Sequence, residues 1–279
     1  MLTAAVYGFV VGDALGVPYL KQSRGTFLCR EMIGFGTAGQ LPGTWSTNTS
    51  LLLATMDSLS HTGTFQAEDL RKYLQQWEHF SAGFPGIKPL SVGATTALAL
   101  MRGVGASSVS ANGSGSLVRM LPFVFVPHTD AQVREASAVT HAHPIAQDAC
   151  VMYTQIAQNL LAWQDLRTAA CNAQQNVLPQ IKAPWRPFFA ESEPELDTSG
   201  YVVHMLEAVL WCLSTTDNYA DAVKAAVNLG GQTATTAALT GGLAGILYGR
   251  NAIPPAWVEK LRKKDVLDRA IHNFSSLYR

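Results

Sequence analysis

The chain has 279 residues, of which 48% are apolar and only 14% are charged, a composition typical of a compact protein with a large buried core. Its 20 basic and 20 acidic residues balance, which argues against a nucleic acid or a membrane surface as a partner. The four cysteines lie far apart in the sequence and form no Cys-x-x-Cys pair, so they predict free thiols and not a metal or redox site.

The N-terminal segment MLTAAVYGFVVGDALG has no positively charged start, and Asp13 interrupts its apolar run. The apolar stretch Ala237–Tyr248 is too short to cross a bilayer. We therefore predict neither a signal peptide nor a membrane span, and we expect a cytoplasmic protein.

Helical periodicity dominates the rest of the chain and predicts an all-α protein. The segments with this pattern are Ser50–Ser60, Ala67–Phe80, Thr95–Met101, Gln147–Leu161, YVVHMLEAVLWCL (201–213), Tyr219–Asn228 and Trp257–Leu261. Thr198 or Ser199 is the expected N-cap of the helix in 201–213. The best strand signal is LPFVFVP (121–127), although Pro122 weakens it.

Two irregular stretches separate these helices. Gly103–Ser116 is rich in glycine and serine, and Val177–Gly200 combines four prolines with aromatic and acidic residues. The second stretch is either a domain linker or a long surface loop beside a pocket, and the core-like helices on both sides favour the loop.

Three short motifs could carry chemistry. In NGSGSLVRMLP (112–122) the amides of Gly115 and Ser116 precede an apolar run, which suits either an anion site or an ordinary flexible loop. In THAHP (140–144) the two histidines face different ways on a helix and could converge only in a turn. In GGQTATT (230–236) either Thr233 or Thr235 is the expected cap of a helix of very small residues, whose glycines permit close helix packing.

The segment GTWSTNTSLLLA (43–54) places hydroxyls and an amide just before an apolar helix. Ser46, Thr47 or Asn48 would each serve as its N-cap. The residues alone require no further role for this segment.

Taken in chain order, six segments resemble the motifs of the ADP-ribosylglycohydrolase family, all-helical enzymes that release ADP-ribose from modified proteins. The segments are GFVVGDALGVPY (8–19), PGTWSTNTSLLLA (42–54), NGSGSLVRMLP (112–122), THAHP (140–144), SGYVVHMLEAVLWCL (199–213) and NLGGQTATTAALTGGLAGILYG (228–249). The resemblance implies one domain over residues 1–279, an orthogonal bundle of helices. It also implies the family's pair of magnesium or manganese ions, unless their ligands are missing.

The chain departs from the family pattern at its acidic positions. Leu20 stands where the family has glutamate, Thr47 and Asn48 where the tryptophan motif has two aspartates, and Gln232 and Ala234 where the last motif has two more. The former metal positions are therefore Leu20, Ser46, Thr47, Asn48, Gln232, Ala234 and Thr235. Because hard cations need carboxylates for charge compensation, we expect no metal site.

The ligand-holding part of the family pattern is retained more fully. The resemblance implies that an ADP-ribose-like ligand contacts the glycine–serine loop, the THAHP motif and the glycine turn before the last helix. The candidate ligand-binding residues are Asn112, Ser114, Gly115, Ser116, His143 and Gly231.

The sequence is compatible with two functions. The first is a catalytically impaired binder of ADP-ribose, of a related nucleotide or of an ADP-ribosylated protein. The alternative is a glycohydrolase with altered, metal-independent chemistry, in which His141, His143, His204 or Asp13 activates water. No matched pair of carboxylates supports the alternative, and Asp13 is better interpreted as a buried helix residue.

Overall fold

The computed structural model describes residues 1–80, 90, 92–175, 177–182 and 196–276, and within these ranges β-structure is limited to isolated bridges. The all-α prediction is therefore confirmed. The α-helices are α1 (Leu2–Gly16), α2 (Thr47–Thr62), α3 (Ala67–Phe80), α4 (Ala94–Arg102), α5 (Asp130–Ala138), α6 (Pro144–Leu161), α7 (Leu166–Ala173), α8 (Pro179–Lys182), α9 (Val202–Ser214), α10 (Tyr219–Asn228), α11 (Thr233–Tyr248), α12 (Pro255–Lys260) and α13 (Lys264–Ser276). Short 3-10 helices join them: η1 (Val17–Tyr19), η2 (Gly36–Ala38), η3 (Val109–Ala111), η4 (Leu117–Arg119), η5 (Leu121–Phe125) and η7 (Arg250–Ala252).

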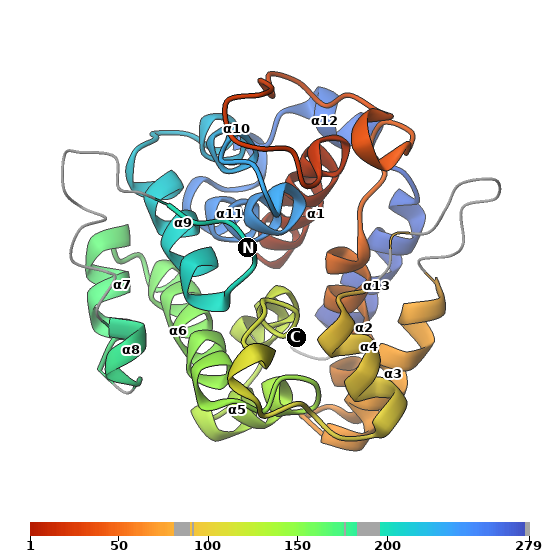
Figure 1. Cartoon of the computed structure of the whole chain (residues 1–279), viewed down its shortest axis with the longest axis vertical. Helices are drawn as coiled ribbons and strands as arrows, with labels where there is room; N and C mark the ends of the chain where they lie inside the picture. Colours follow the sequence, from red (N-terminus) through yellow and green to blue (C-terminus); the bar gives the residue numbers. More distant parts are fainter. Residues whose placement is uncertain (81–89, 91, 176, 183–195, 277–279) are drawn as a thin grey trace.

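Helices α1 and α11 form the centre of the fold and lie side by side (Figure 1). Their backbones approach so closely that a Cβ atom on Gly8 would lie 2.2 Å from the carbonyl oxygen of Gly241, and one on Gly12 would lie 2.1 Å from that of Ala237. The expected close packing of the glycines in α11 is thus confirmed. The segment Leu2–Tyr19 is long and apolar enough to cross a membrane, but 89% of it is buried inside the protein.

The remaining helices surround this central pair. Helix α2 packs against α3 and α13 on one side of the molecule, and α6 packs against α5, α7 and α9 on the other (Figure 1). Helix α10 covers α11. The chain enters α2, α4, α9 and α11 beside one common cavity, which is described below.

Residues 121–125, which carry the best strand signal in the sequence, form the 3-10 helix η5 with Pro122 in its first turn, and the segment is apolar because it is almost wholly buried. Two predicted helix caps are wrong, each because the side chain makes a tertiary contact instead. Helix α9 begins after Tyr201 without a side-chain cap, while the Thr198 hydroxyl donates to the carbonyl of Gly230. Helix α11 begins after Gln232, and the Thr233 hydroxyl donates to the carbonyl of Gly16 instead of capping.

Other local predictions are confirmed. The bounds of α3 and α10 are those that the sequence indicates, and Ser46 caps α2 by accepting from the backbone amide of Asn48 at 3.1 Å. The glycine–serine loop 103–116 is held by bridges from Ala106 to His141 and from Gly113 to Tyr201. Most of the proline-rich stretch after Val177 lies outside the described residues.

Candidate ligand-binding cavity

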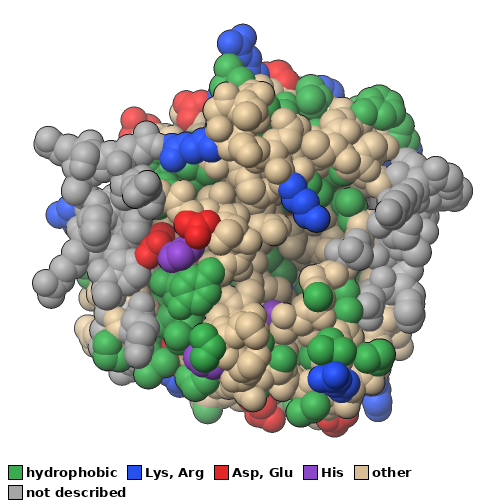
Figure 2. Space-filling view, viewed as in Figure 1, with side chains coloured by type: hydrophobic (Ala, Val, Ile, Leu, Met, Phe, Trp, Pro, Cys, Tyr) green, Lys and Arg blue, Asp and Glu red, His purple; other side chains and the backbone are tan. Residues whose placement is uncertain are grey.

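A cavity of about 590 Å³ lies where the starts of α2, α4, α9 and α11 meet the glycine–serine loop. On the face drawn in Figure 2 the surface is hollowed near its centre, and the atoms there are mostly tan, the colour of backbone and uncharged polar side chains. The described residues that line the cavity are 20–21, 46–48, 51, 90, 92–96, 113–115, 141, 199–200, 232 and 234–235. Among them, Lys21 is the only one with a permanently charged side chain.

Asp13 on α1 supports the cavity from behind and is fully buried. Its carboxylate accepts from the backbone amides of Ser46 and Thr49 at 2.8 and 3.2 Å and from both hydroxyls at 2.6 Å. Asn48 Nδ2 adds a fifth hydrogen bond at 3.2 Å. Since an ionised carboxylate has about four lone-pair sites, Asp13 has no free lone pair for water or a metal. It closes the first turn of α2, as the buried-helix interpretation of Asp13 predicts.

Two opposing effects act on the pKa of Asp13. Burial raises the pKa of Asp13, and the hydrogen bonds from Ser46, Thr49 and Asn48 oppose that shift because they stabilise the ionised form. The carboxylate also lies at the N-terminus of α2, where the helix dipole favours a negative charge. Asp13 therefore acts on the cavity through the residues at the start of α2 that it holds in place.

Asn48 joins two motifs that are distant in sequence. Its Nδ2 atom donates to Asp13 Oδ1 at 3.2 Å and to Thr235 Oγ1 at 3.3 Å. The bond to Thr235 links the start of α2 to the start of α11 across 187 positions of the chain. An N–H group therefore occupies the junction between the two motifs, and a cation placed there would meet a donor where it needs a lone pair.

The residues at this junction do not fit a pair of divalent cations. Ser46, Thr47, Asn48, Gln232 and Thr235 offer only neutral oxygens, and Leu20 and Ala234 offer none beyond the backbone. Within the described ranges no group of three or more His, Cys, Asp or Glu side chains could hold a metal ion. About four positive charges would thus remain uncompensated in a partly buried site.

The opposite wall of the cavity is the loop 113–115, which packs on Thr96 and His141. A Cβ atom on Gly115 would lie 2.7 Å from Thr96 Oγ1 and 2.8 Å from His141 Cε1, so this position requires glycine. The amide of Ser114 donates to the carbonyl of Gly200 at 3.2 Å. The amide of Gly115 has no acceptor within the part of the chain that the structure describes, so it is available to a ligand that reaches it, whereas Ser116 is fully buried.

The glycine turn before α11 positions Lys21. Gly230 and Gly231 have φ values of 78° and 63°, in the left-handed region that glycine adopts without strain. The carbonyl of Gly231 accepts from the amide of Lys21 at 2.9 Å, and the amide of Gly231 donates to the carbonyl of Gln22 at 2.8 Å. Gly231 therefore supports the cavity through its backbone and does not line it.

The structure brings together some of the predicted ligand-binding residues and not others. Ser114 and Gly115 line the cavity together with all seven residues at positions where the resemblance implies metal ligands. Asn112 donates to the carbonyl of Val109, and the Ser116 hydroxyl oxygen lies 2.9 Å from that of Ser137 and accepts from Cys150 within the core. These two residues, like Gly231, are not among the lining residues.

His143 is also placed outside the lining, at the N-terminus of α6. Its Nδ1 accepts from the amide of Ile145 at 3.2 Å, so the ring caps the helix. His141, by contrast, lines the cavity. The two rings of the THAHP motif therefore serve different elements and do not form a shared site.

Sequence reasoning missed Lys21, Thr96 and Gly200 as parts of the cavity. Lys21 could have been found from its place next to Leu20 in the first motif. Thr96 gives no such signal, because nothing in its local sequence indicates that α4 faces α2 and the loop 113–115.

Three of the candidate general bases, Asp13, His143 and His204, do not present a free basic atom to the cavity. Asp13 is saturated with donors, and His143 is a helix cap. His204 Nδ1 lies 3.2 Å from Asp197 Oδ2, and His204 is not among the described lining residues. Burial and the nearby Arg119 lower the pKa of His141 to about 3, so its ring is neutral at physiological pH.

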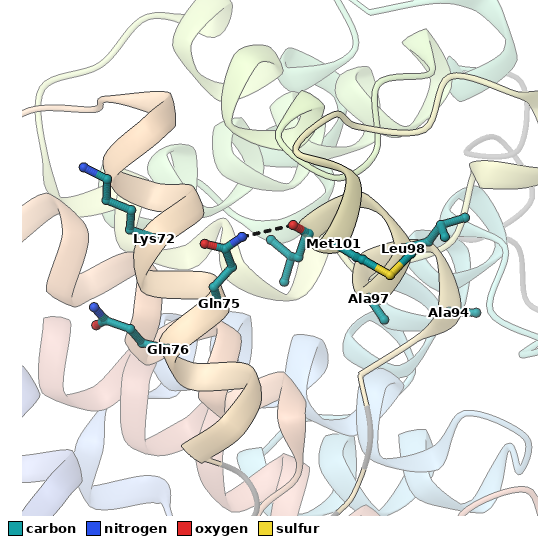
Figure 3. A pocket seen from close by; sticks show the side chains of 8 residues that line it. Lys72, Gln75, Gln76, Ala94, Ala97, Leu98 and Met101 are labelled. Atoms are coloured by element: carbon teal, nitrogen blue, oxygen red, sulfur yellow. Dashed lines mark hydrogen bonds between the residues drawn. The ribbon is translucent and has the colours of Figure 1, made fainter.

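A second hollow, of about 980 Å³, lies between α3 and α4 (Figure 3). Leu98 and Met101 of α4 are among the residues that line it, and Gln75 on α3 donates to the carbonyl of Leu100 at 3.0 Å, the dashed line in Figure 3. This hollow is larger than the cavity between α2 and α11, but the described residues that line it include no acidic, histidine or cysteine side chain. We therefore assign the chemistry to the cavity between α2 and α11.

Comparisons with known proteins identify the family. The family model described as ADP-ribosylglycohydrolase matches residues 2–279. The chain belongs to the ADP-ribosylglycohydrolase family. A solved structure described as an ADP-ribosylglycohydrolase-related protein complex superimposes with a TM-score of 0.83 at 26% identity, over 100% of this chain and 98% of that one.

Two relatives in this family are named for their substrates. The ADP-ribosylarginine hydrolase Tri1 of Serratia proteamaculans (strain 568) is 28% identical over 275 residues, which cover 94% of this chain and 75% of that protein. The ADP-ribosyl-[dinitrogen reductase] glycohydrolase of Rhodospirillum rubrum is 28% identical over 280 residues, which cover 93% and 90%.

Proposed function

We propose that this protein binds ADP-ribose or a related nucleotide, free or attached to a protein, in the cavity between α2 and α11. We further propose that it does so without the dinuclear metal site and without metal-dependent hydrolysis. Its partner is then a cytoplasmic ADP-ribosylated protein or the free nucleotide. No observation calls for nucleic acid or a membrane as a ligand.

The observation that carries the proposal is the hydrogen bond from Asn48 Nδ2 to Thr235 Oγ1. It connects the two motifs directly, so the cavity keeps its shape without a bridging cation. The amide donates a second bond to Asp13, and both acceptors are thereby satisfied by the protein itself.

The charges around the cavity suit an anionic ligand. Lys21 is the only permanently charged side chain among the described lining residues, and the N-termini of α4 and α11 meet the cavity with the positive ends of their dipoles. The amide of Gly115, which has no acceptor among the described residues, adds a donor on the opposite wall. A diphosphate would therefore find donors and positive potential without metal ions.

Hydrolysis by altered chemistry is the second candidate, because relatives of this chain are named as hydrolases. Cleavage of a glycosidic bond needs a general base for water and an acid for the leaving group. Among the groups considered for these roles only His141 lines the cavity, and no carboxylate among the described lining residues stands beside it as the acid, which favours binding over catalysis.

Two measurements test the proposal together. Thermal denaturation with ADP-ribose should give a higher Tm, and Lys21→Glu should reduce that gain, whereas Lys72→Glu on α3 should not, although it changes the net charge equally. Incubation with ADP-ribosylated arginine and Mg²⁺ should release no ADP-ribose. Release of ADP-ribose, or a Tm that ADP-ribose does not change, would overturn the proposal.

A further inference from the structure

A cation is buried directly behind the loop 113–115. The Arg119 side chain is fully buried and donates from one NH2 group to the carbonyl of Ala136 and from the other to Thr140 Oγ1, both at 2.8 Å. Its Nε atom has no hydrogen-bond partner, and it forms no ion pair with any residue that the structure describes. Burial lowers the pKa of Arg119 to about 10, so the guanidinium remains charged at neutral pH.

The Thr140 hydroxyl connects this cation to the cavity. Thr140 is fully buried, and its Oγ1 lies 2.8 Å from His141 Nδ1. The hydroxyl oxygen already accepts from Arg119, and its single hydrogen has no other acceptor in the described residues than His141 Nδ1. The Thr140 hydroxyl proton and His141 Nδ1 are both satisfied only if Thr140 donates and Nδ1 accepts.

The ring of the neutral His141 then carries its proton on Nε2, the nitrogen that has no partner in the described part of the protein. The backbone holds the residue in place, because the His141 amide donates to the carbonyl of Ser137 at 2.8 Å and the Ser137 hydroxyl donates to the carbonyl of His141 at 3.0 Å. The missing side chain of Gly115 leaves the Nε2 edge uncovered, since a Cβ atom there would lie 3.2 Å from Nε2.

We propose that Arg119 and Thr140 are positioning residues that fix His141 as a hydrogen-bond donor, and that His141 Nε2–H donates to an oxygen of the ligand in the cavity. This inference rests on the proposed function and adds Arg119 and Thr140 as the residues that decide which nitrogen of His141 carries the proton. The buried guanidinium polarises the chain of hydrogen bonds from Arg119 through Thr140 to His141, which strengthens the donor at its end. A phosphate or ribose oxygen is the acceptor that an ADP-ribose-like ligand would supply.

The first test is nuclear magnetic resonance of the ligand-free protein labelled with ¹⁵N-histidine. We expect His141 to show a proton on Nε2 and an Nδ1 resonance shifted by an accepted hydrogen bond. Thr140→Val should move the Nδ1 resonance to the position of a free imine nitrogen, and Thr140→Ser should restore it. Thr55→Val, which removes a buried hydroxyl that bonds only within α2, should leave it unchanged.

The role of the cation is tested by Arg119→Met. This variant removes the donor to the Thr140 hydroxyl, which can then accept a hydrogen bond from His141 Nδ1. The Nδ1 resonance should therefore shift away from its value in the unmodified protein. If that variant does not fold, the two Thr140 variants still decide the inference. A proton on Nδ1 in the unmodified protein, or identical Nδ1 resonances in all variants, would overturn it.

The second test is ADP-ribose affinity. Thr140→Val should weaken binding by roughly three- to tenfold, the effect of losing one hydrogen bond that orients a donor, and Thr140→Ser should restore the affinity. Equal affinities would overturn the assignment of His141 as a ligand donor. If the unmodified protein does not bind ADP-ribose, the proposed function and the donor role both fail, whereas the resonance measurement, which uses no ligand, separately decides how His141 is held.

Discussion

Asn48 Nδ2 lies 3.3 Å from Thr235 Oγ1, and this hydrogen bond ties the start of α2 to the start of α11. Both residues stand at positions where the family resemblance places metal ligands. The resemblance implies that a cation joins these two helix starts. In this chain a direct hydrogen bond between two neutral side chains joins them instead. Because it needs no charge compensation, it is compatible with the absence of carboxylates from the described lining of the cavity.

Replacing this amide by a carboxylate should destabilise the protein. Asn48→Asp places a second carboxylate about 3 Å from Asp13 Oδ1, so one of the two must retain a proton in the folded state. The folded state then binds a proton that the unfolded chain releases above about pH 4, and the free energy of unfolding falls as pH rises. We expect a loss of about 1–3 kcal/mol at pH 7, smaller at pH 5, in urea denaturation.

The matched control is Asn48→Ala, which removes the same hydrogen bonds without adding a charge. Its loss of unfolding free energy relative to the unmodified protein should be the same at pH 5 and pH 7. An Asn48→Asp variant with an equally constant loss would contradict the like-charge argument.

Restoring four carboxylates should create a magnesium site. With Thr47→Asp, Asn48→Asp, Gln232→Asp and Ala234→Asp combined, hard oxygen ligands return to both helix starts. Mg²⁺ at 100 times its Kd should then stabilise the variant by about 2.7 kcal/mol, measured as a rise in Tm that EDTA reverses. Mg²⁺ should leave the Tm of the unmodified protein unchanged, and a comparable rise there would contradict our account of the cavity.

Much of the fold could be predicted because the helices that lie on the surface are amphipathic. Ala67–Phe80 and Tyr219–Asn228 have one apolar face, and their periodicity indicates both of their ends. Helix α1 is buried on every side and has no such period. Its sequence therefore does not indicate where the helix begins or ends. The segment 121–125 is misleading for the same reason, since complete burial gives strands and 3-10 helices the same apolar composition.

The cavity could be predicted only in part. The family resemblance indicates the former metal positions, because these lie in short continuous motifs. The bonds of Asn48 with Asp13 and Thr235 join residues 35 and 187 positions apart, and no local pattern specifies them. Membership of a motif also does not place a residue in the cavity. His143 caps its own helix, whereas His141, two residues earlier in the same motif, lines the cavity.

Closing the space above His141 should abolish ligand binding. Gly115→Ala places a methyl group 2.7 Å from Thr96 Oγ1 and over the Nε2 edge of His141, so the loop must move and the donor is covered. We expect at least about a tenfold loss of ADP-ribose affinity. Gly113→Ala, whose Cβ atom would be 3.8 Å from His141 Nε2 in ordinary contact, should cost clearly less, and equal losses in the two variants would argue against this geometry.

The burial of His141 should make the protein sensitive to acid. Its pKa is lowered to about 3 in the folded state, against about 6.5 in an unfolded chain, so the unfolded state binds more protons between these values. The stabilisation is fully present above about pH 6.5 and is lost as pH falls, with a slope of at most about 1.4 kcal/mol per pH unit. Urea denaturation between pH 4.5 and pH 7 should show a shallower slope for His141→Gln, and an unchanged slope would contradict the prediction.

The most direct test of the central claim is calorimetric titration of the unmodified protein with ADP-ribose, once in Mg²⁺ and once in EDTA. A cavity that binds its ligand without metal ions predicts the same Kd in both buffers and no heat from hydrolysis. Binding that occurs only with Mg²⁺ would contradict the account of the Asn48–Thr235 junction, and no binding in either buffer would contradict the assignment of the ligand.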